Sequence, residues 1–141
     1  AHLSTIEKNI QSNLSVNRKV GPTQYEVLVS DIFEEFRSDV KFDYILTNPP
    51  YIDKEARTVD ENVVEHEPHL ALFGGVAGME LITRIIAAAP QHLTPTGQLW
   101  IEHEPAQVAA ITSLAQTHRF SVITHPDQYG VPRFSVLTMA Q

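Results

Sequence analysis

Segments with a helical pattern alternate with extended segments along this chain, and this alternation restricts its fold more than any other feature. Apolar residues recur at helical spacing in residues 1–15, 81–89 and 105–115. Short, mostly apolar runs predict strands over residues 25–30, 42–47, 98–102, 120–124 and 133–139. This order predicts an α/β fold, with a mostly parallel sheet that helices cover on both faces. The last two strands are too close for a helical crossover, so they predict an antiparallel hairpin.

The composition excludes several classes of function. The chain has 141 residues, enough for one domain with a buried core. Its 17 acidic and 10 basic residues give a formal net charge of −7, which disfavours direct binding to nucleic acid. No apolar run approaches the ~20 residues of a membrane-spanning helix, so we expect no membrane partner. The absence of cysteine excludes disulfides, thiolate metal sites and cysteine nucleophiles.

Three polar residues stand at the predicted carboxyl ends of strands. They are Asp31, Asn48 and Glu102. Open α/β sheets bind ligands at the carboxyl ends of their strands, so we expect the three side chains to share one rim of the sheet. The strand before Asn48, residues 42–47, is mostly apolar and is expected to be buried on both faces.

The tetrapeptide Asn48-Pro49-Pro50-Tyr51 is the most informative motif in the sequence. Two consecutive prolines offer carbonyl acceptors without an N–H donor, and their fixed φ angles make the loop stiff. Asn48 adds a side-chain carbonyl, so this corner suits an –NH2 group that donates both hydrogens. Tyr51 can stack on a planar amide or base. A simple strand-ending turn is the alternative, but the buried strand before it and the aromatic residue after it favour a functional site.

Matches along most of the chain extend this motif to a family. They are Asn48-Pro49-Pro50-Tyr51-Ile52, Glu67-Pro68, Ala71-Leu72, Gly75, Gly78, Glu102, Gln107, Asp127, Gly130 and Arg133. With these residues the sequence resembles the HemK/PrmC family of S-adenosylmethionine-dependent methyltransferases. Those enzymes methylate the side-chain nitrogen N5 of the glutamine in the GGQ loop of peptide-chain release factors.

The resemblance implies a role for each matching site residue. Asn48 and the Pro49 carbonyl would accept hydrogen bonds from the substrate amide, Pro50 would stiffen the corner, and Tyr51 would pack on the amide plane. Asp31 would bind the adenine amino group of S-adenosylmethionine, Ile32 would lie beside the adenine ring, and Asn48 would also contact the cofactor. No metal is implied. The partner would be a release factor, in the cytoplasm or, for a eukaryotic homologue, in the mitochondrion.

The resemblance also implies a Rossmann-like class I methyltransferase fold with strand order 3-2-1-4-5-7-6. By this alignment residues 1–141 form a single partial catalytic domain. Its first two strands, with their glycine-rich cofactor loop, and the N-terminal helical domain are missing. We therefore expect the strand over residues 25–30 to lack a neighbour and the strand over 42–47 to be an apolar edge. One position departs from the family, because Glu104 stands where a glycine is usual.

Other interpretations remain open. The motif is shared with nucleic-acid adenine N6-methyltransferases, and a non-catalytic module that binds a protein partner could keep the same fold. His66, His69 and His103 could bind a metal, but their spacing matches no ligand pattern. The acidic loop from Asp60 to Glu67 is interpreted as a solvated loop rather than as a rim for a basic partner. The glycines in residues 74–78 indicate the start of a helix rather than a phosphate-binding loop.

Overall fold

The computed structural model describes residues 3–16, 25–51 and 78–140. The chain divides into two compact units, Ala1–Glu35 and Phe36–Gln141, and each is described here by itself. In the first unit the predicted amphipathic helix is confirmed as α1 (Leu3–Val16). The Asn13 side chain in this helix donates a hydrogen bond of 2.8 Å to the Asn9 carbonyl, one turn earlier.

The predicted strand over residues 25–30 is wrong, because these residues have no regular secondary structure. A strand is defined by hydrogen bonds to a neighbour, and the strands of the described sheet begin only at Phe42. Residues 31–36 form turns and bends, and Ile32 takes a left-handed φ of 57°. Asp31 therefore follows an irregular segment rather than the carboxyl end of a strand.

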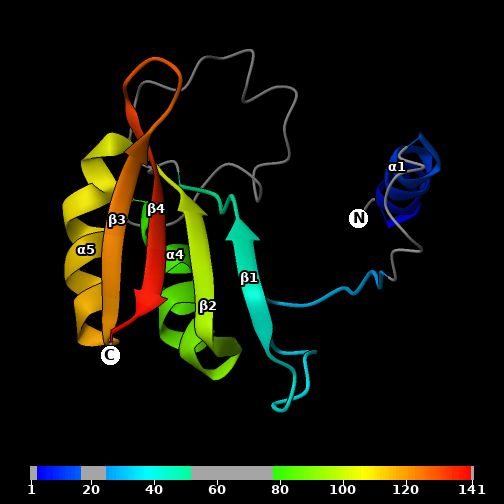
Figure 1. The fold of residues 1–141 in the computed structure, drawn as a ribbon, viewed down its shortest axis with the longest axis horizontal. Helices are drawn as coiled ribbons and strands as arrows, with labels where there is room; N and C mark the ends of the chain where they lie inside the picture. Colours follow the sequence, from blue (N-terminus) through cyan, green and yellow to red (C-terminus); the bar gives the residue numbers. More distant parts are fainter. Residues whose placement is uncertain (1–2, 17–24, 52–77, 141) are drawn as a thin grey trace. The chain divides into compact units, whose positions relative to one another are not determined.

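The second unit is built on a four-stranded sheet, shown in Figure 1. Its strands are β1 (Phe42–Thr47), β2 (Leu93–Glu102), β3 (Phe120–Pro126) and β4 (Pro132–Met139), in the order β1-β2-β4-β3. β1 and β2 are parallel, and β4 is antiparallel to both of its neighbours. The predicted hairpin is thus confirmed, and the order agrees with strands 4-5-7-6 of the expected fold. β2 begins earlier than predicted, with an irregular register between Phe42 and Tyr44.

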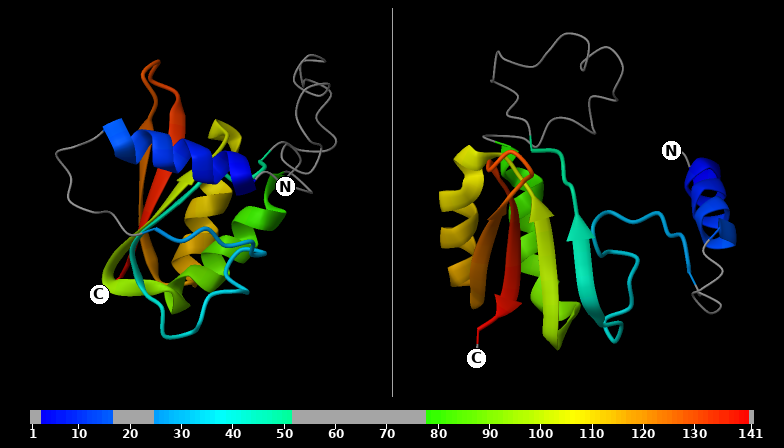
Figure 2. Two further views of the ribbon diagram at one scale, coloured as in Figure 1. Left: turned by 90° about the vertical axis from the view of Figure 1, so that its right-hand side faces the viewer. Right: turned by 45° about the horizontal axis from the view of Figure 1, so that its top comes forward.

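Two α-helices of this unit pack on one face of the sheet (Figures 1 and 2). They are α4 (Glu80–Ala88), which continues into the 3₁₀ turn η2 (Ala89–Gln91), and α5 (Val108–Thr117), which follows the 3₁₀ turn η3 (Pro105–Gln107). Pro90 lies two residues after the end of α4 and ends this helix as predicted, since proline cannot continue the hydrogen-bond ladder. None of the helices in the described parts of the chain could span a lipid bilayer.

The hydrophobic core lies between these helices and the sheet. Ile82 and Ile86 of α4, Ile111 of α5, and Leu99 and Ile101 of β2 are completely buried there. Side chains alternate between the two faces of a strand, so the neighbours of Leu99 and Ile101 along β2 point to the other face.

Within this unit, the described residues leave the other face largely open. The helix α1 belongs to the first unit, so the prediction of helices on both faces stays a prediction. Tyr44 and Leu46 of β1 are 63% and 73% exposed, and Ile123 of β3 is 63% exposed. Trp100 stacks on His125 on this face, with ring centroids 6.2 Å apart. The prediction that β1 is buried on both faces is not met within this unit, because no described element of the unit covers the face that carries Tyr44 and Leu46. The expected place of β1 as an apolar edge is confirmed.

A buried chain of hydrogen bonds ties β2 to β4 and β3. His103 and Ser135 are completely buried, and His103 Nε2 lies 2.8 Å from Ser135 Oγ. His103 Nδ1 lies 3.0 Å from the Glu104 carbonyl, so Nδ1 must carry the proton and Nε2 must accept from Ser135. Thr124 Oγ1 continues the chain, 3.1 Å from Ser135 Oγ. Since both nitrogens are used, the ring has none free for a metal.

Burial lowers the pKa of His103 below its usual value, and the nearby Arg133 adds to this effect. The folded state therefore favours the neutral ring, and the associated stability is full above the unfolded-state pKa of about 6.5. We expect the free energy of unfolding to fall as the pH decreases from about 7 to 5. In urea titrations, this dependence should be weaker for His103→Asn, which keeps a donor for the Glu104 carbonyl but does not titrate. An equal dependence in the variant would contradict the assignment.

Candidate functional site

The carboxyl ends of β1 and β2 form one wall of a cavity. Because the two strands are parallel and Thr47 pairs with Ile101, Asn48 and Glu102 come to the same edge of the sheet. The cavity has a volume of about 400 Å³ and is lined by Leu46, Thr47, Asn48, Trp100, Glu102 and Phe134. The expected rim is thus confirmed for two of its three residues. Asp31 and Ile32 belong to the other unit, and neither follows a strand.

Asn48 offers a free acceptor at this edge. Its side chain is exposed and makes no hydrogen bond to any other residue in the described parts of the chain, whereas Pro49 is buried and Pro50 is half-buried. The two prolines cannot donate through their nitrogens, so they leave the loop rich in acceptors. The exposed side-chain oxygen of Asn48 can therefore accept from an N–H donor, such as a carboxamide or an exocyclic amine.

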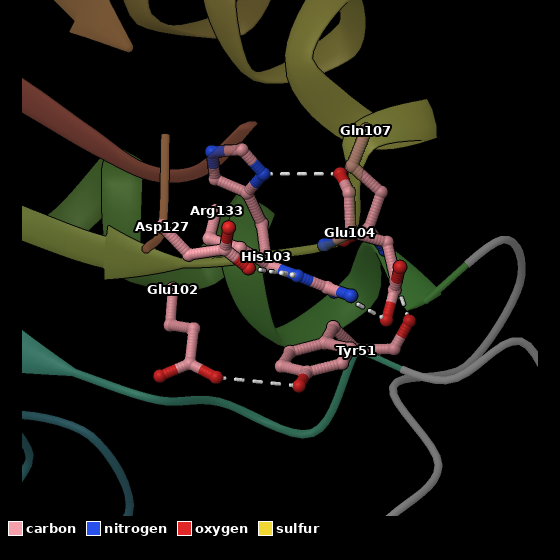
Figure 3. Close-up of polar contacts among 7 residues, drawn as sticks. All are labelled: Tyr51, Glu102, His103, Glu104, Gln107, Asp127 and Arg133. Carbon is pink, nitrogen blue, oxygen red and sulfur yellow. Dashed lines mark hydrogen bonds and ion pairs between the residues drawn. The ribbon is translucent and has the colours of Figure 1, made fainter. Parts of the chain in front are cut away.

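Tyr51 is held at both of its ends, as Figure 3 shows. The Gln107 side-chain nitrogen Nε2 donates to the Tyr51 carbonyl at 3.0 Å. The Tyr51 hydroxyl donates to Glu102 Oε1 at 3.3 Å, a long hydrogen bond. Burial raises the pKa of Tyr51, and the negative charges of Glu102 and Glu104 raise it further. The phenol therefore stays protonated at neutral pH and presents its hydroxyl hydrogen to Glu102.

Gly78 allows another segment to approach the Tyr51 carbonyl closely. A Cβ atom added at Gly78 would lie 1.8 Å from the Tyr51 oxygen, and the φ angle of Gly78 is +67°. Both the space and the backbone angle therefore require glycine at this position. This finding gives a physical reason for a glycine just before α4, which the sequence indicated only as a helix start.

The turn from β2 into η3 supplies Gln107 in a fixed orientation. Glu104 is the N-cap of η3, and its backbone N–H donates to Gln107 Oε1 at 3.0 Å in a reciprocal capping box. The φ of Glu104 is −77°, an angle that any residue adopts. Glutamate in place of the family's usual glycine therefore causes no strain. Its carboxylate instead accepts a hydrogen bond of 2.8 Å from Arg133.

The β3–β4 loop is held by hydrogen bonds of its own and is joined to this turn through Arg133. Asp127 Oδ1 accepts hydrogen bonds from the backbone N–H groups of Tyr129 and Val131, at 2.8 and 3.0 Å. Gly130 completes the loop with a φ of +80°. Asp127 Oδ2 also lies 3.7 Å from Arg133 Nε, so Arg133 joins the loop to Glu104.

The sequence did not predict the contacts of Tyr51 with Glu102 and Gln107, nor that of Arg133 with Glu104. The signals that could have indicated them are the polar end of β2 and the Glu-x-x-Gln spacing of a capping box. Several predicted features lie outside the described residues. They are Ile52, the acidic loop Asp60–Glu67, His66, Glu67-Pro68, His69, Ala71-Leu72, Gly74 and Gly75.

The sequence of the chain is similar to those of known glutamine methyltransferases. It is 35% identical over 115 residues to the release factor glutamine methyltransferase of Koribacter versatilis, covering 80% of this chain and 40% of that protein. The enzyme of the same description from Lactococcus lactis is 31% identical over 134 residues, covering 92% and 48%. The ribosomal protein uL3 glutamine methyltransferase of Bradyrhizobium diazoefficiens is 45% identical over 64 residues, covering 45% and 20%. No family model matches the chain.

The solved structures support the fold. The ribosomal protein L11 methylase of Lactobacillus delbrueckii superposes with a TM-score of 0.59 at 14% identity, covering 96% of this chain and 53% of that one. The chain therefore has the fold of a class I methyltransferase. It spans less than half the length of the curated relatives described above.

We expect Gly78→Ala to destabilise the fold more than Gly130→Ala. Both substitutions place a side chain at a positive φ, at a cost of about 1–2 kcal/mol. Only Gly78→Ala also meets the Tyr51 carbonyl, whereas a Cβ at Gly130 has no atom within 4 Å. Overpacking of this kind adds about 1–3 kcal/mol. Urea unfolding of both variants measures the difference, and equal losses of stability would show that Gly78 does not support Tyr51.

Proposed function

Because the chain is a relative of the release factor glutamine methyltransferases, we propose that it forms the amide-binding part of a methyl-transfer site. The reaction would move a methyl group from S-adenosylmethionine to the side-chain nitrogen of a glutamine in a protein. The single observation that carries this proposal is the exposed side chain of Asn48, an acceptor at the carboxyl end of β1. It lies beside a cavity of about 400 Å³ at the carboxyl ends of two parallel strands.

The corner addresses the main chemical difficulty of this reaction. An amide nitrogen is a weak nucleophile, because its lone pair is delocalised into the carbonyl. Asn48 Oδ1 and the Pro49 carbonyl can each accept one hydrogen of the amide –NH2 group, which orients the nitrogen and increases its electron density. S-adenosylmethionine would supply the methyl group to this nitrogen, and its sulfur would keep the electron pair of the broken C–S bond. One amide proton then leaves to water, so the chain need not supply a base.

The cofactor would supply a methyl group on a positively charged sulfur. The cavity fits such a group, since it combines the apolar walls of Leu46, Trp100 and Phe134 with the carboxylate of Glu102. Asn48 would contact both the cofactor and the amide. Asp31 and Ile32, in the first unit, are proposed to bind the adenine amino group and the adenine ring.

We infer that the substrate is the GGQ glutamine of a peptide-chain release factor, in the cytoplasm or in a mitochondrion. Support comes from the relatives named for that substrate, which match up to 92% of this chain. A glutamine of ribosomal protein uL3 is a second candidate, favoured by the 45% identity to the Bradyrhizobium enzyme. Both are protein substrates, which agrees with the net charge of −7 better than DNA does.

A chimera tests this function directly. In it, the chain replaces the matching segment of the Koribacter versatilis enzyme, which then supplies the remaining length. We expect transfer of a labelled methyl group to a release factor, and none to a release factor whose GGQ glutamine is changed to alanine. Transfer to uL3 alone would select the second substrate, and transfer to DNA adenine would select nucleic-acid methylation. No transfer together with release-factor binding would indicate a non-catalytic module.

Asn48→Ala in this chimera should reduce kcat by about 100-fold or more, since it removes one of the two acceptors that act on the developing charge. Folding should be unaffected, because the Asn48 side chain is exposed. Asn9→Ala in α1 makes the same chemical change at another exposed asparagine and is the matched control. Steady-state kinetics with the release factor measure the effect. Full activity in Asn48→Ala would contradict the proposed amide contact.

A further inference from the structure

We propose that Gln107 is a positioning residue of this methyl-transfer site, acting through the carbonyl group of Tyr51. The inference rests on the proposed function and extends it to a residue outside the motif. Gln107 lies 56 positions after Tyr51 and belongs to a different element, η3. Its side chain donates a hydrogen bond to the backbone carbonyl of Tyr51, so it acts on the motif loop rather than on the substrate.

The Gln107 amide can take only one orientation. The side chain is 6% exposed, its Nε2 donates to the Tyr51 carbonyl at 3.0 Å, and its Oε1 accepts from the Glu104 N–H at 3.0 Å. A rotated amide would place oxygen against the carbonyl and N–H against N–H, and would lose both hydrogen bonds. The β2–η3 turn thus fixes the donor that meets Tyr51.

The carbonyl of Tyr51 has little freedom to move. Gly78 closes over it so tightly that a Cβ there would lie 1.8 Å from the oxygen and 2.6 Å from Gln107 Nε2. Three segments far apart in sequence therefore meet at one oxygen atom: the motif loop, Gly78 before the start of α4, and η3.

Pro49 and Pro50 transmit the restraint on the Tyr51 carbonyl to Asn48. Pro49 and Pro50 have fixed φ angles, so Asn48 and Tyr51 stand at the two ends of a stiff dipeptide. A fixed carbonyl at Tyr51 limits how far Asn48 can rotate away from the cavity. It also keeps the Tyr51 hydroxyl within reach of Glu102. Gln107 therefore determines both the amide-binding corner and the ring that would cover the amide.

Gln107 has two separable roles, and substitutions distinguish them. Gln107→Glu keeps an acceptor for the Glu104 N–H, so the cap of η3 remains, but it removes the donor to Tyr51. Gln107→Met removes both contacts with a side chain of similar length. Gln116 is an exposed glutamine of α5, so Gln116→Glu and Gln116→Met are matched controls for the same chemical changes.

The kinetic test uses the chimera described above. In Gln107→Glu we expect kcat for the release factor to fall by about 10- to 100-fold, the effect of a small misplacement of reacting groups. The KM should change less than twofold. The thermal midpoint should fall below that of Gln116→Glu, because a buried carboxylate then faces the Tyr51 carbonyl, so kcat is compared at a temperature at which both variants are folded. Such a split between kcat and KM separates positioning from a structural role. An unchanged kcat in Gln107→Glu, or a loss of kcat that only follows a loss of folding, would overturn the proposal.

A second measurement uses the 141-residue chain without any substrate. The ionisation of Tyr51 is isolated from that of the other three tyrosines by ultraviolet titration against Tyr51→Phe in each background. In Gln107→Met the pKa of Tyr51 should fall towards the ordinary phenol value, because the ring leaves its half-buried place beside Glu102. Gln116→Met should leave it unchanged. An unchanged pKa in Gln107→Met would overturn the restraint on Tyr51, even if the chimera proves inactive and the proposed function fails.

Discussion

The parallel pairing of β1 with β2 is the interaction on which the rest of the second unit depends. It aligns residues that are 54 positions apart in sequence, with Ile45 beside Leu99 and Thr47 beside Ile101. Because parallel strands end at the same edge, this register brings Asn48 and Glu102 to one cavity. The same register buries Leu99 and Ile101 against the helices, so the core and the site share one constraint.

Restraint of the motif loop comes from outside the motif. The two prolines make the loop stiff but do not orient it, since a stiff segment can still rotate as a body. Orientation comes from Gly78, which admits the Tyr51 carbonyl, and from Gln107, which donates to it. The salt bridge of Glu104 with Arg133 joins this arrangement to β4. The loop from Asn48 to Tyr51 can thus align a substrate amide, because the surrounding turns fix its position.

Local patterns predicted the helices, β1, the closing hairpin and the role of Pro90, because each depends on spacing or on one residue's backbone chemistry. Residues 25–30 have the composition of a strand, but strand formation depends on a partner that composition does not reveal. The exposure of Leu46 depends on which elements pack on its face of the sheet, and composition does not reveal these either. In the site, Asn48 and Tyr51 could be recognised from the motif, whereas the hydrogen bond from Gln107 depends on tertiary structure.

The long sequence separation across the β1–β2 pair has a consequence for folding kinetics. The pairs of this ladder and the Tyr51–Gln107 hydrogen bond each close a loop of about 50 residues before they gain any contact energy. The β3–β4 hairpin closes over only a few residues and can form early. The acceptor corner should therefore be among the last parts of the chain to become ordered. Destabilising substitutions in the hairpin should slow refolding more than those near Tyr51, which should mainly speed unfolding.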